Sequence, residues 1–270
     1  MKSLIIPLKY TALALAALLV FSIIQGVSQG VSSLGEFIFE DREETEGLVE
    51  MQGAEIPGEL RNIKLEGNSV DFNVIQGKKL YLEANIDNLS YYEDSDTLVI
   101  DATNYSPTEN VKVNIYLPDN TALEDVSVEA GKGNINISIL SCKEFTLDIG
   151  ACDTFIEMLN VSGEAEINGG AGDVTIASGE ISNLDLEMGV GNFSFAGKLN
   201  GESNLEMGVG NAELCLTGSR NDYALDVSKG IGSVLVDGSE LKGDSDIGSG
   251  NSKIDIDSGV GNTTVTFKNK

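Results

Sequence analysis

The feature that most constrains the fold is a glycine tetrad that recurs at a nearly fixed interval. Gly-x-Gly-Asn or a close variant occurs eight times from residue 131 onward. Successive first glycines are 19, 20, 19, 19, 22, 18 and 11 residues apart, and they are Gly131, Gly150, Gly170, Gly189, Gly208, Gly230, Gly248 and Gly259. A period near 19 residues is typical of a protein built from stacked repeats.

The residues around each tetrad alternate between apolar and polar, which indicates β-strands with one buried face. Six residues after the first glycine, every unit has an apolar side chain: Ile137, Ile156, Ile176, Phe195, Leu214, Val236, Ile254 and Val265. One unit cannot bury this face alone, but stacked units form a continuous core. We therefore predict an all-β chain, a β-solenoid with coils of about 19 residues. An antiparallel sandwich or barrel is the second interpretation.

The tetrad positions have separate structural explanations. The first glycine indicates a positive φ angle or a close approach between coils. The last position is Asn, Asp or Ser in every unit, and these residues suit turns and hydrogen-bond to backbone. We expect them to stack into a hydrogen-bonded ladder. The Gly-x-Gly pieces do not indicate a nucleotide site, because no Gly-x-Gly-x-x-Gly motif occurs and no helix pattern follows them.

The N-terminus predicts the compartment. Lys2 and Lys9 flank the start of an uncharged run from Tyr10 to Val27, and the next charged residue is Glu36. This charge order predicts that residues 1–35 are a signal-anchor or transmembrane helix, with the bulk of the chain extracytoplasmic. The expected location is the plasma membrane, single-pass. If the segment is instead a cleaved signal peptide, the protein is secreted.

The rest of the chain divides into a stalk and a β domain. Residues 36–60 are acidic and predict an extended stalk. Residues 61–270 predict the β-solenoid domain, in which residues 61–120 form a capping β region and residues 121–270 the Gly-x-Gly-Asn repeats. The short last interval predicts that the final unit is half a coil, with Lys268 and Lys270 protecting its edge.

Composition excludes several functions. The chain has 43 acidic and 17 basic residues, a net charge of −26, and no histidine. Without histidine, Ser-His-Asp and Cys-His catalysis and zinc sites with histidine ligands cannot form. Both basic residues before Glu36 lie in the N-terminal segment, so the remaining chain has 15 basic and 43 acidic residues. This acidity argues against a nucleic-acid partner and favours a soluble outer surface.

Stacking would align one acidic column two residues before each first glycine. Its members are Glu129, Asp148, Asn168, Glu187, Glu206, Ser228, Asp246 and Asp257. Aligned carboxylates repel one another, and calcium could relieve this with oxygen ligands. Asn168 and Ser228 interrupt the column, so we predict no dedicated metal site, although weak surface calcium binding stays open. We predict no catalytic residues, no cofactor and no small-molecule substrate.

Cysteines and tyrosines give weaker signals. Cys142 and Cys152 lie ten residues apart, so a disulfide between them stays open in an exported protein. Because Cys215 makes the number of cysteines odd, at least one thiol is free or forms an intermolecular bond. Tyr91 and Tyr92 form an exposed-looking pair, with Tyr105 nearby. Aromatic side chains can bind sugars, but packing at a strand edge is the interpretation we favour.

The order of segments resembles a known family. An N-terminal anchor is followed by strands, by the Val111–Leu123 pattern VKVNIYLPDNTAL, and by GNINI and the repeated tetrads. This resembles the prokaryotic β-strand-repeat family labelled "putative adhesin", over roughly residues 60–270. The resemblance implies a β-repeat domain of unknown function in an envelope protein, and no catalytic residues come with it.

Two functional classes therefore remain, with a third as a weak alternative. The first is a non-enzymatic, membrane-anchored, adhesin-like or envelope interaction module, whose partner would be a cell-envelope polymer or surface protein. The second is an accessory sensor or regulator of an envelope-stress or transport system. The weak alternative is a glycan-acting β-helix enzyme, which the scarcity of arginine disfavours, since Arg220 is the only arginine after residue 61.

Overall fold

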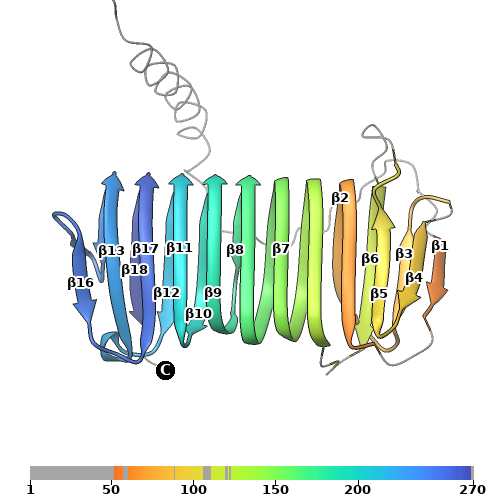
Figure 1. Ribbon diagram of the computed structural model, residues 1–270, viewed down its shortest axis with the longest axis horizontal. Helices are drawn as coiled ribbons and strands as arrows, with labels where there is room; N and C mark the ends of the chain where they lie inside the picture. Colours follow the sequence, from red (N-terminus) through yellow and green to blue (C-terminus); the bar gives the residue numbers. More distant parts are fainter. Residues whose placement is uncertain are drawn as a thin grey trace, which may run out of the picture. The chain divides into compact units, whose positions relative to one another are not determined.

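The described part of the chain is almost entirely β-strand (Figure 1). The computed structural model describes residues 52–268, apart from 57–59, 88, 106–110, 119, 120 and 122. Its strands are β1 (Gln52–Glu55), β2 (Asn62–Gly77), β3 (Tyr81–Ala84), β4 (Ser90–Asp94), β5 (Thr97–Ala102), β6 (Val111–Pro118), β7 (Leu123–Ala171), β8 (Val174–Ile176), β9 (Gly179–Val190), β10 (Phe193–Leu199), β11 (Glu202–Val209), β12 (Ala212–Thr217), β13 (Tyr223–Ile231), β14 (Val234–Val236), β15 (Ser239–Glu240), β16 (Ser245–Gly248), β17 (Ser252–Val260) and β18 (Thr263–Lys268). The all-β prediction is confirmed.

The described residues contain one short 3-10 helix, η2 (Arg220–Asp222). Within the same residues, no helix has the length and hydrophobicity needed to cross a membrane. The predicted membrane segment at residues 1–35 and most of the stalk at residues 36–60 lie outside the described residues. The last part of the predicted stalk is described, and it forms β1, which pairs with β3 in antiparallel register.

Strands one repeat apart pair in parallel, which favours a solenoid over an antiparallel sandwich. Leu205 in β11 lies opposite Leu186 in β9, and Leu214 in β12 lies opposite Phe195 in β10. Each coil contributes one strand before its tetrad and one after it, so the stack has two broad faces. Face A contains β5, β11, β13 and β17 with adjoining parts of β2, β7 and β9. Face B contains β6, β8, β10, β12, β14 and β18 with the remaining parts of β2 and β7.

The last coil in the sequence is not the last coil in the stack. β17 pairs in parallel with β11 on one side and with β13 on the other, and β18 pairs in the same way with β12 and β14. Residues 252–268 therefore fill a space between two coils that precede them in the sequence. In Figure 1, β17 and β18 lie between β11 and β13.

The prediction of a terminal half-coil is therefore wrong. β16 runs antiparallel to β13 at the end of the stack, and the tetrad at Gly248 belongs to the chain reversal that follows. Because the chain turns back there, β17 and β18 form a complete coil inside the stack. Lys268 lies opposite Thr217 on one side, and on the other side the pairing of β18 with β14 ends at Val265, so the predicted edge protection by Lys268 stays a prediction.

The N-terminal coil is placed in the same way. β2 pairs in parallel with β5 and β6 on one side and with β7 on the other, although β5 and β6 come between β2 and β7 in the sequence. Three antiparallel strands then cover this end of the stack, because β4 pairs with β5, β3 with β6 and β1 with β3. Both ends thus finish in antiparallel strands instead of an open parallel edge.

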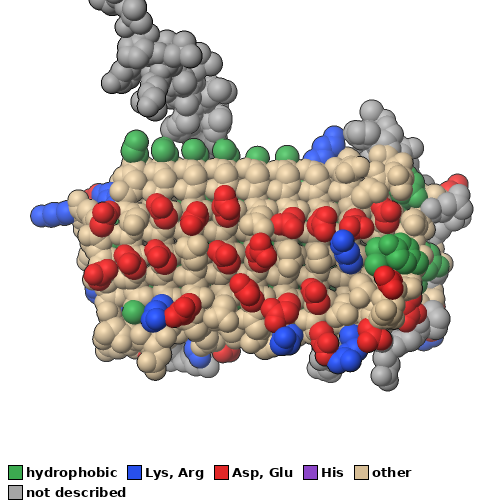
Figure 2. Space-filling view, in the orientation of Figure 1, with side chains coloured by type: hydrophobic (Ala, Val, Ile, Leu, Met, Phe, Trp, Pro, Cys, Tyr) green, Lys and Arg blue, Asp and Glu red, His purple; other side chains and the backbone are tan. Residues whose placement is uncertain are grey.

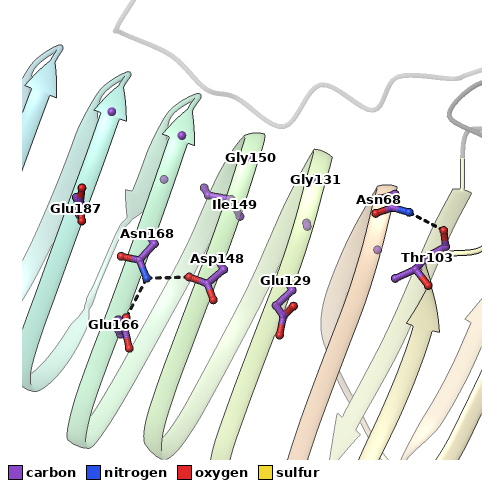
Figure 3. Close-up of a pocket in the computed structure, with 15 residues that line it drawn as sticks. Asn68, Thr103, Glu129, Gly131, Asp148, Ile149, Gly150, Glu166, Asn168 and Glu187 are labelled. Atoms are coloured by element: carbon purple, nitrogen blue, oxygen red, sulfur yellow. Dashed lines mark hydrogen bonds between the residues drawn. The ribbon is translucent and has the colours of Figure 1, made fainter.

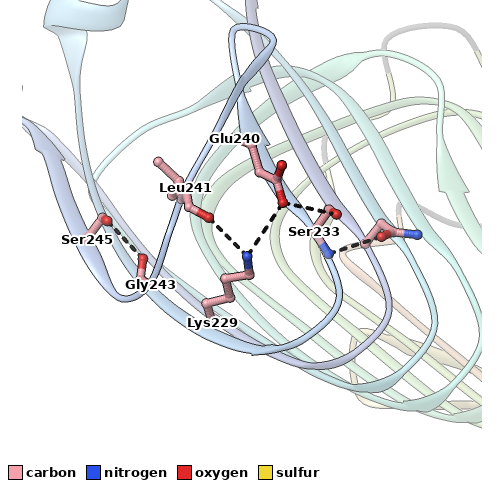
Figure 4. A network of polar contacts seen from close by, with 7 residues as sticks. Lys229, Ser233, Glu240, Leu241, Gly243 and Ser245 are labelled. Atoms are coloured by element: carbon pink, nitrogen blue, oxygen red, sulfur yellow. Dashed lines mark hydrogen bonds and ion pairs between the residues drawn. The ribbon is translucent and has the colours of Figure 1, made fainter.

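A polar network fixes the strands that close the C-terminal end (Figure 4). The Lys229 ammonium donates a hydrogen bond to the Leu241 carbonyl at 3.0 Å and lies 3.8 Å from the Glu240 carboxylate. Ser233 donates to the same carboxylate at 3.4 Å. Since the Lys229 side chain is only 17% exposed, these partners replace much of the water that would otherwise surround its charge.

The core is a series of apolar columns between the two faces. Inward side chains of successive coils are almost completely buried, and one such column contains Ile137, Ile156, Ile176, Phe195, Leu214, Val265 and Val236. Buried polar side chains in the described part are Thr154, Ser203, Ser258 and Thr263. Ser258 and Thr263 share a hydrogen bond of 2.8 Å, whereas the Thr154 hydroxyl has no hydrogen-bond partner.

Replacement of Thr154 by valine is expected to stabilise the protein. Valine keeps the shape of threonine and removes a buried hydroxyl that has no partner, so we expect the free energy of unfolding to rise by about 1 kcal/mol. Thr263→Val is the matched control, because it leaves the Ser258 hydroxyl unpaired and should lower the same quantity by about 1 kcal/mol. Urea denaturation measures both. If both variants change the free energy of unfolding by the same amount and in the same direction, the Thr154 and Thr263 hydroxyls do not differ in hydrogen bonding as described.

Candidate functional site

Most coil corners are joined to a neighbouring corner by the side chain that ends the tetrad. Asn192 donates through its backbone and side-chain nitrogens to Asp173, both at 2.8 Å, and Asn211 donates to Asn192 at 3.2 and 2.8 Å. We call the coil formed by β17 and β18 the inserted coil. The ladder continues through it, because Asn262 donates to Asn211 and the Ser233 backbone donates to Asn262. The predicted ladder is confirmed, and it assigns these residues a structural role.

The tetrad glycines are needed because neighbouring coils approach very closely. A Cβ atom on Gly189 would lie 2.6 Å from the carbonyl oxygen of Gly170 in the next coil. Gly191, at the third tetrad position, also has a φ of +147°, and its Cβ would lie 1.8 Å from the Gly172 oxygen. The first position therefore depends on close approach, and the third on close approach together with positive φ.

A column without side chains leaves an open groove along the edge of face A (Figure 3). The groove has a volume of about 890 Å³, and its floor includes Gly131, Gly150, Gly170 and Gly189. Beside these glycines lie Glu129, Asp148, Asn168 and Glu187, which the sequence predicted in one acidic column. The structure therefore brings together the N-terminal half of that column.

Asparagine side chains link carboxylates of this column to carboxylates of the neighbouring row, which contains Glu166, Asp185 and Asn204. Asn168 donates to Asp148 at 2.8 Å and to Glu166 at 3.0 Å, and Figure 3 shows its amide between the two. Asn204 is placed in the same way between Asp185 and Glu206, at 3.3 and 3.5 Å. Asn168 thus interrupts the column as predicted, and it also relieves carboxylate repulsion without a metal ion.

The inserted coil changes the C-terminal half of the column. Asp257 lies between Glu206 and Ser228, so three carboxylates are consecutive: Glu187, Glu206 and Asp257. Asp246, which the sequence placed in this column, instead lies opposite Asp226. The spacing of the tetrads could not reveal this arrangement, because the predicted column depends on coils that stack in sequence order.

A second acidic row lies beside the first on face A. Its C-terminal members are Asp255, Asp226 and Asp246, which lie opposite one another in register. Burial, followed by the charges of Asp226, Asp257 and Glu206, raises the pKa of Asp255 above its usual range. Figure 2 shows these rows of acidic side chains running along face A. Within the residues that the structure describes, no three His, Cys, Asp or Glu side chains form a group that could hold a metal ion.

An apolar row borders the glycine column on its other side. It consists of the second residues of four tetrads, Val190, Val209, Val260 and Ile231, and we call these residues the edge row. They lie opposite one another on successive coils; Val190 is 38% exposed and Ile231 73% exposed, and Val209 and Val260 are half-buried. Figure 2 shows hydrophobic side chains along this edge above the acidic rows. The edge row is not among the features predicted from the sequence, although the apolar residue between the tetrad glycines is its signal.

Face B carries fewer charges in its central row. Registered side chains there are Asn114, Asn73, Asn136, Phe155, Thr175, Ser194, Glu213, Thr264 and Leu235. Asn136 donates to Asn73, and Asn73 donates to Asn114, at 3.0 and 2.9 Å. The acidity of the described domain is therefore concentrated on face A.

The cysteines and tyrosines do not add a reactive site. Cys142, Cys152 and Cys215 are free thiols, so the Cys142–Cys152 pairing that the sequence left open is not made. Burial raises the pKa of Cys142 to about 12 and that of Cys152 to about 11, which disfavours the reactive thiolate. Tyr91 and Tyr92 are exposed on β4, opposite Ile100 and Val99.

These features define a class of protein, an all-β stack of parallel coils with one acidic face. Residues 60–266 match the family model described as Toastrack DUF4097, and the chain belongs to that family. No match was found among proteins with curated descriptions.

Several solved structures are similar to the chain. A "putative adhesin" from Bacteroides fragilis is 15% identical, with 82% of this chain and 96% of that chain covered and a TM-score of 0.44. A "putative cell adhesion protein" from Clostridium sporogenes is 16% identical, with 81% and 99% covered and a TM-score of 0.31. A "putative lipid binding protein" from Parabacteroides distasonis is 14% identical, with 79% and 96% covered and a TM-score of 0.32.

Proposed function

We propose that this chain is a non-enzymatic, adhesin-like interaction module of the cell envelope. In this proposal residues 1–35 anchor it in the plasma membrane, the part of the predicted stalk at residues 36–60 that precedes β1 forms the stalk, and the β-solenoid domain lies outside the cytoplasm. Its partner is a macromolecule of the envelope, a polymer or a surface protein. Membership of a β-repeat family of unknown function supports an interaction role without assigning a partner.

The observation that carries the proposal is the registered arrangement of face A. Carboxylates repeat from coil to coil at a spacing of about 4.8 Å: Glu187, Glu206 and Asp257 are consecutive, and Glu129, Asp148 and Glu187 line an open groove that ends at Gly189. Such a surface offers the same contact many times along one direction, which suits a long partner better than a small molecule. The Asn168 and Asn204 amides hold carboxylates in place, and the side chains that line the groove include no basic residue to assist acid–base chemistry.

Binding assays with the full-length chain test this function. The probes are isolated cell-wall polymers and whole cells, each assayed with added calcium and with a chelator. We expect calcium-independent binding that weakens by about tenfold when Glu187→Gln, Glu206→Gln and Asp257→Asn are combined. Glu213→Gln on face B is the control and should leave binding unchanged. If the chain binds neither the cell-wall polymers nor whole cells, the result counts against adhesion.

A further inference from the structure

We infer that the edge row and the acidic column beside it form a docking site for a basic amphipathic helix of a partner protein. This inference rests on the proposed function and names the chemistry of the partner. The docking site consists of Val190, Val209, Val260 and Ile231 on one side and Glu187, Glu206 and Asp257 on the other. The glycine column, continued by Gly208 and Gly259, lies between them.

Exposed apolar side chains give the first reason. Within the described residues, few large hydrophobic side chains are exposed, and Val190 and Ile231 of the edge row are among them. The Asn ladder already joins the corners of these coils, so the apolar row is not required for turn geometry. The first tetrad of the series has Lys132 at the same position, which shows that the turn accepts a charged residue there.

Charge complementarity gives the second reason. The four face A strands that carry the docking site, β9, β11, β13 and β17, hold two basic residues, Lys229 and Lys253, and both are engaged. Lys253 forms an ion pair with Glu202 at 2.6 Å, and Lys229 contacts Leu241 and Glu240. Glu206 and Asp257 therefore retain a net negative field, which is reinforced by Asp255 and Asp226 in the next row. A partner with lysine or arginine beside its apolar residues would match both rows.

Spacing gives the third reason and distinguishes a helix from a strand. Coils lie about 4.8 Å apart, and successive turns of an α-helix lie about 5.4 Å apart, whereas alternate residues of an extended strand lie about 6.6 Å apart. A helix parallel to the stack therefore places one apolar residue near each member of the edge row. Three coil intervals span about 14 Å, which is the length of about 10 helical residues.

The width of the site also suits a helix. The edge row lies three residues beyond the acidic column, a separation of about 10 Å along the strand. A helix with its side chains is about 10 Å across. The glycine column between the two rows presents no side chain that would keep the helix away from the surface. The apolar face of the helix would then contact the edge row while its basic residues reach the carboxylates.

The test uses the full-length chain and a synthetic peptide of 18 residues, with leucines at helical spacing on one face and lysines beside them. Fluorescence anisotropy measures the dissociation constant at two salt concentrations. We expect Val209→Ser combined with Val260→Ser to weaken binding by about tenfold or more, and Phe155→Ser on face B to leave it unchanged. A scrambled peptide of the same composition should bind at least about tenfold more weakly.

Other outcomes overturn the inference. Equal binding of the scrambled peptide would indicate general attraction of cations to an acidic protein. Equal weakening by Phe155→Ser would place the peptide on face B. Light scattering and vesicle flotation identify the competing occupants: a dimer that Val209→Ser abolishes assigns the row to a second copy of the chain, and binding to phosphatidylglycerol vesicles assigns it to a lipid surface. If the unsubstituted chain binds envelope polymers but does not bind the peptide, this inference is overturned and the proposed function stays intact.

Discussion

Deletion of residues 249–270 is expected to disrupt the coils on both sides of the inserted coil. The deletion removes β17 and β18, which are the partners of β11 and β13 on face A and of β12 and β14 on face B. It also removes the buried side chains Ile254, Ile256 and Val265, whose burial contributes about 5 kcal/mol or more. Hydrogen exchange should show that amides of β11 and β13 both lose protection, and the melting temperature should fall.

A stack in sequence order predicts a different result. In that arrangement the deletion would remove only the last repeat, and β11 would keep its protection because β13 would be its neighbour. Deletion of residues 269 and 270 is the control, since it leaves every described strand intact and should change nothing.

A double-mutant cycle checks the same arrangement without shortening the chain. Leu205 lies directly opposite Ile256, so Leu205→Ala and Ile256→Ala should be coupled by about 0.5 kcal/mol or more. Leu205 and Val227 are separated by the inserted coil, and their alanine variants should be nearly additive. The reverse pattern of coupling would contradict the inserted coil.

The inserted coil also shows what sequence reasoning can and cannot predict here. The inward positions follow from alternation, because a strand with one buried face must present apolar residues at every second place. Which coil lies next to which does not follow. β11, β13 and β17 present Leu205, Val227 and Ile256 at the same inward position, so each offers an equivalent surface to a parallel neighbour.

The candidate site reflects the same limit. Its N-terminal half, from Glu129 to Glu187, could be predicted because coils there stack in sequence order. Its C-terminal half depends on Asp257 entering between Glu206 and Ser228, which only the pairing of β17 reveals. The tetrad at Gly248 misled the prediction, because a glycine-rich reversal between β16 and β17 has the same local sequence as a coil corner.

Substitution of Gly210 by alanine is expected to be strongly destabilising. Gly210 has a φ of +149°, and a Cβ atom there would lie 1.6 Å from the carbonyl oxygen of Gly191. Both partners of this contact are backbone, so no side chain can move aside, and the coils would have to separate. Separation would also break the Asn192–Asn211 link of the ladder. We expect the free energy of unfolding to fall by about 3–5 kcal/mol in urea denaturation.

Two other glycines separate the causes of this loss. Gly238 has a φ of +72° with nothing within 4 Å of its Cβ position, so Gly238→Ala should cost only the backbone strain of about 1 kcal/mol. Gly243 also has open space, and its φ lies outside the positive range, so Gly243→Ala should be neutral or stabilise by up to about 1 kcal/mol. If Gly210→Ala costs no more than Gly238→Ala, backbone strain alone explains the tetrad glycine and close approach between coils does not. Because alanine is also more strained at the φ of Gly210 than at that of Gly238, Gly189→Ala isolates the contact: the φ of Gly189 lies outside the positive range, and its Cβ would lie 2.6 Å from the Gly170 carbonyl oxygen. A clear loss of stability in Gly189→Ala identifies coil contact as a reason that the tetrad recurs.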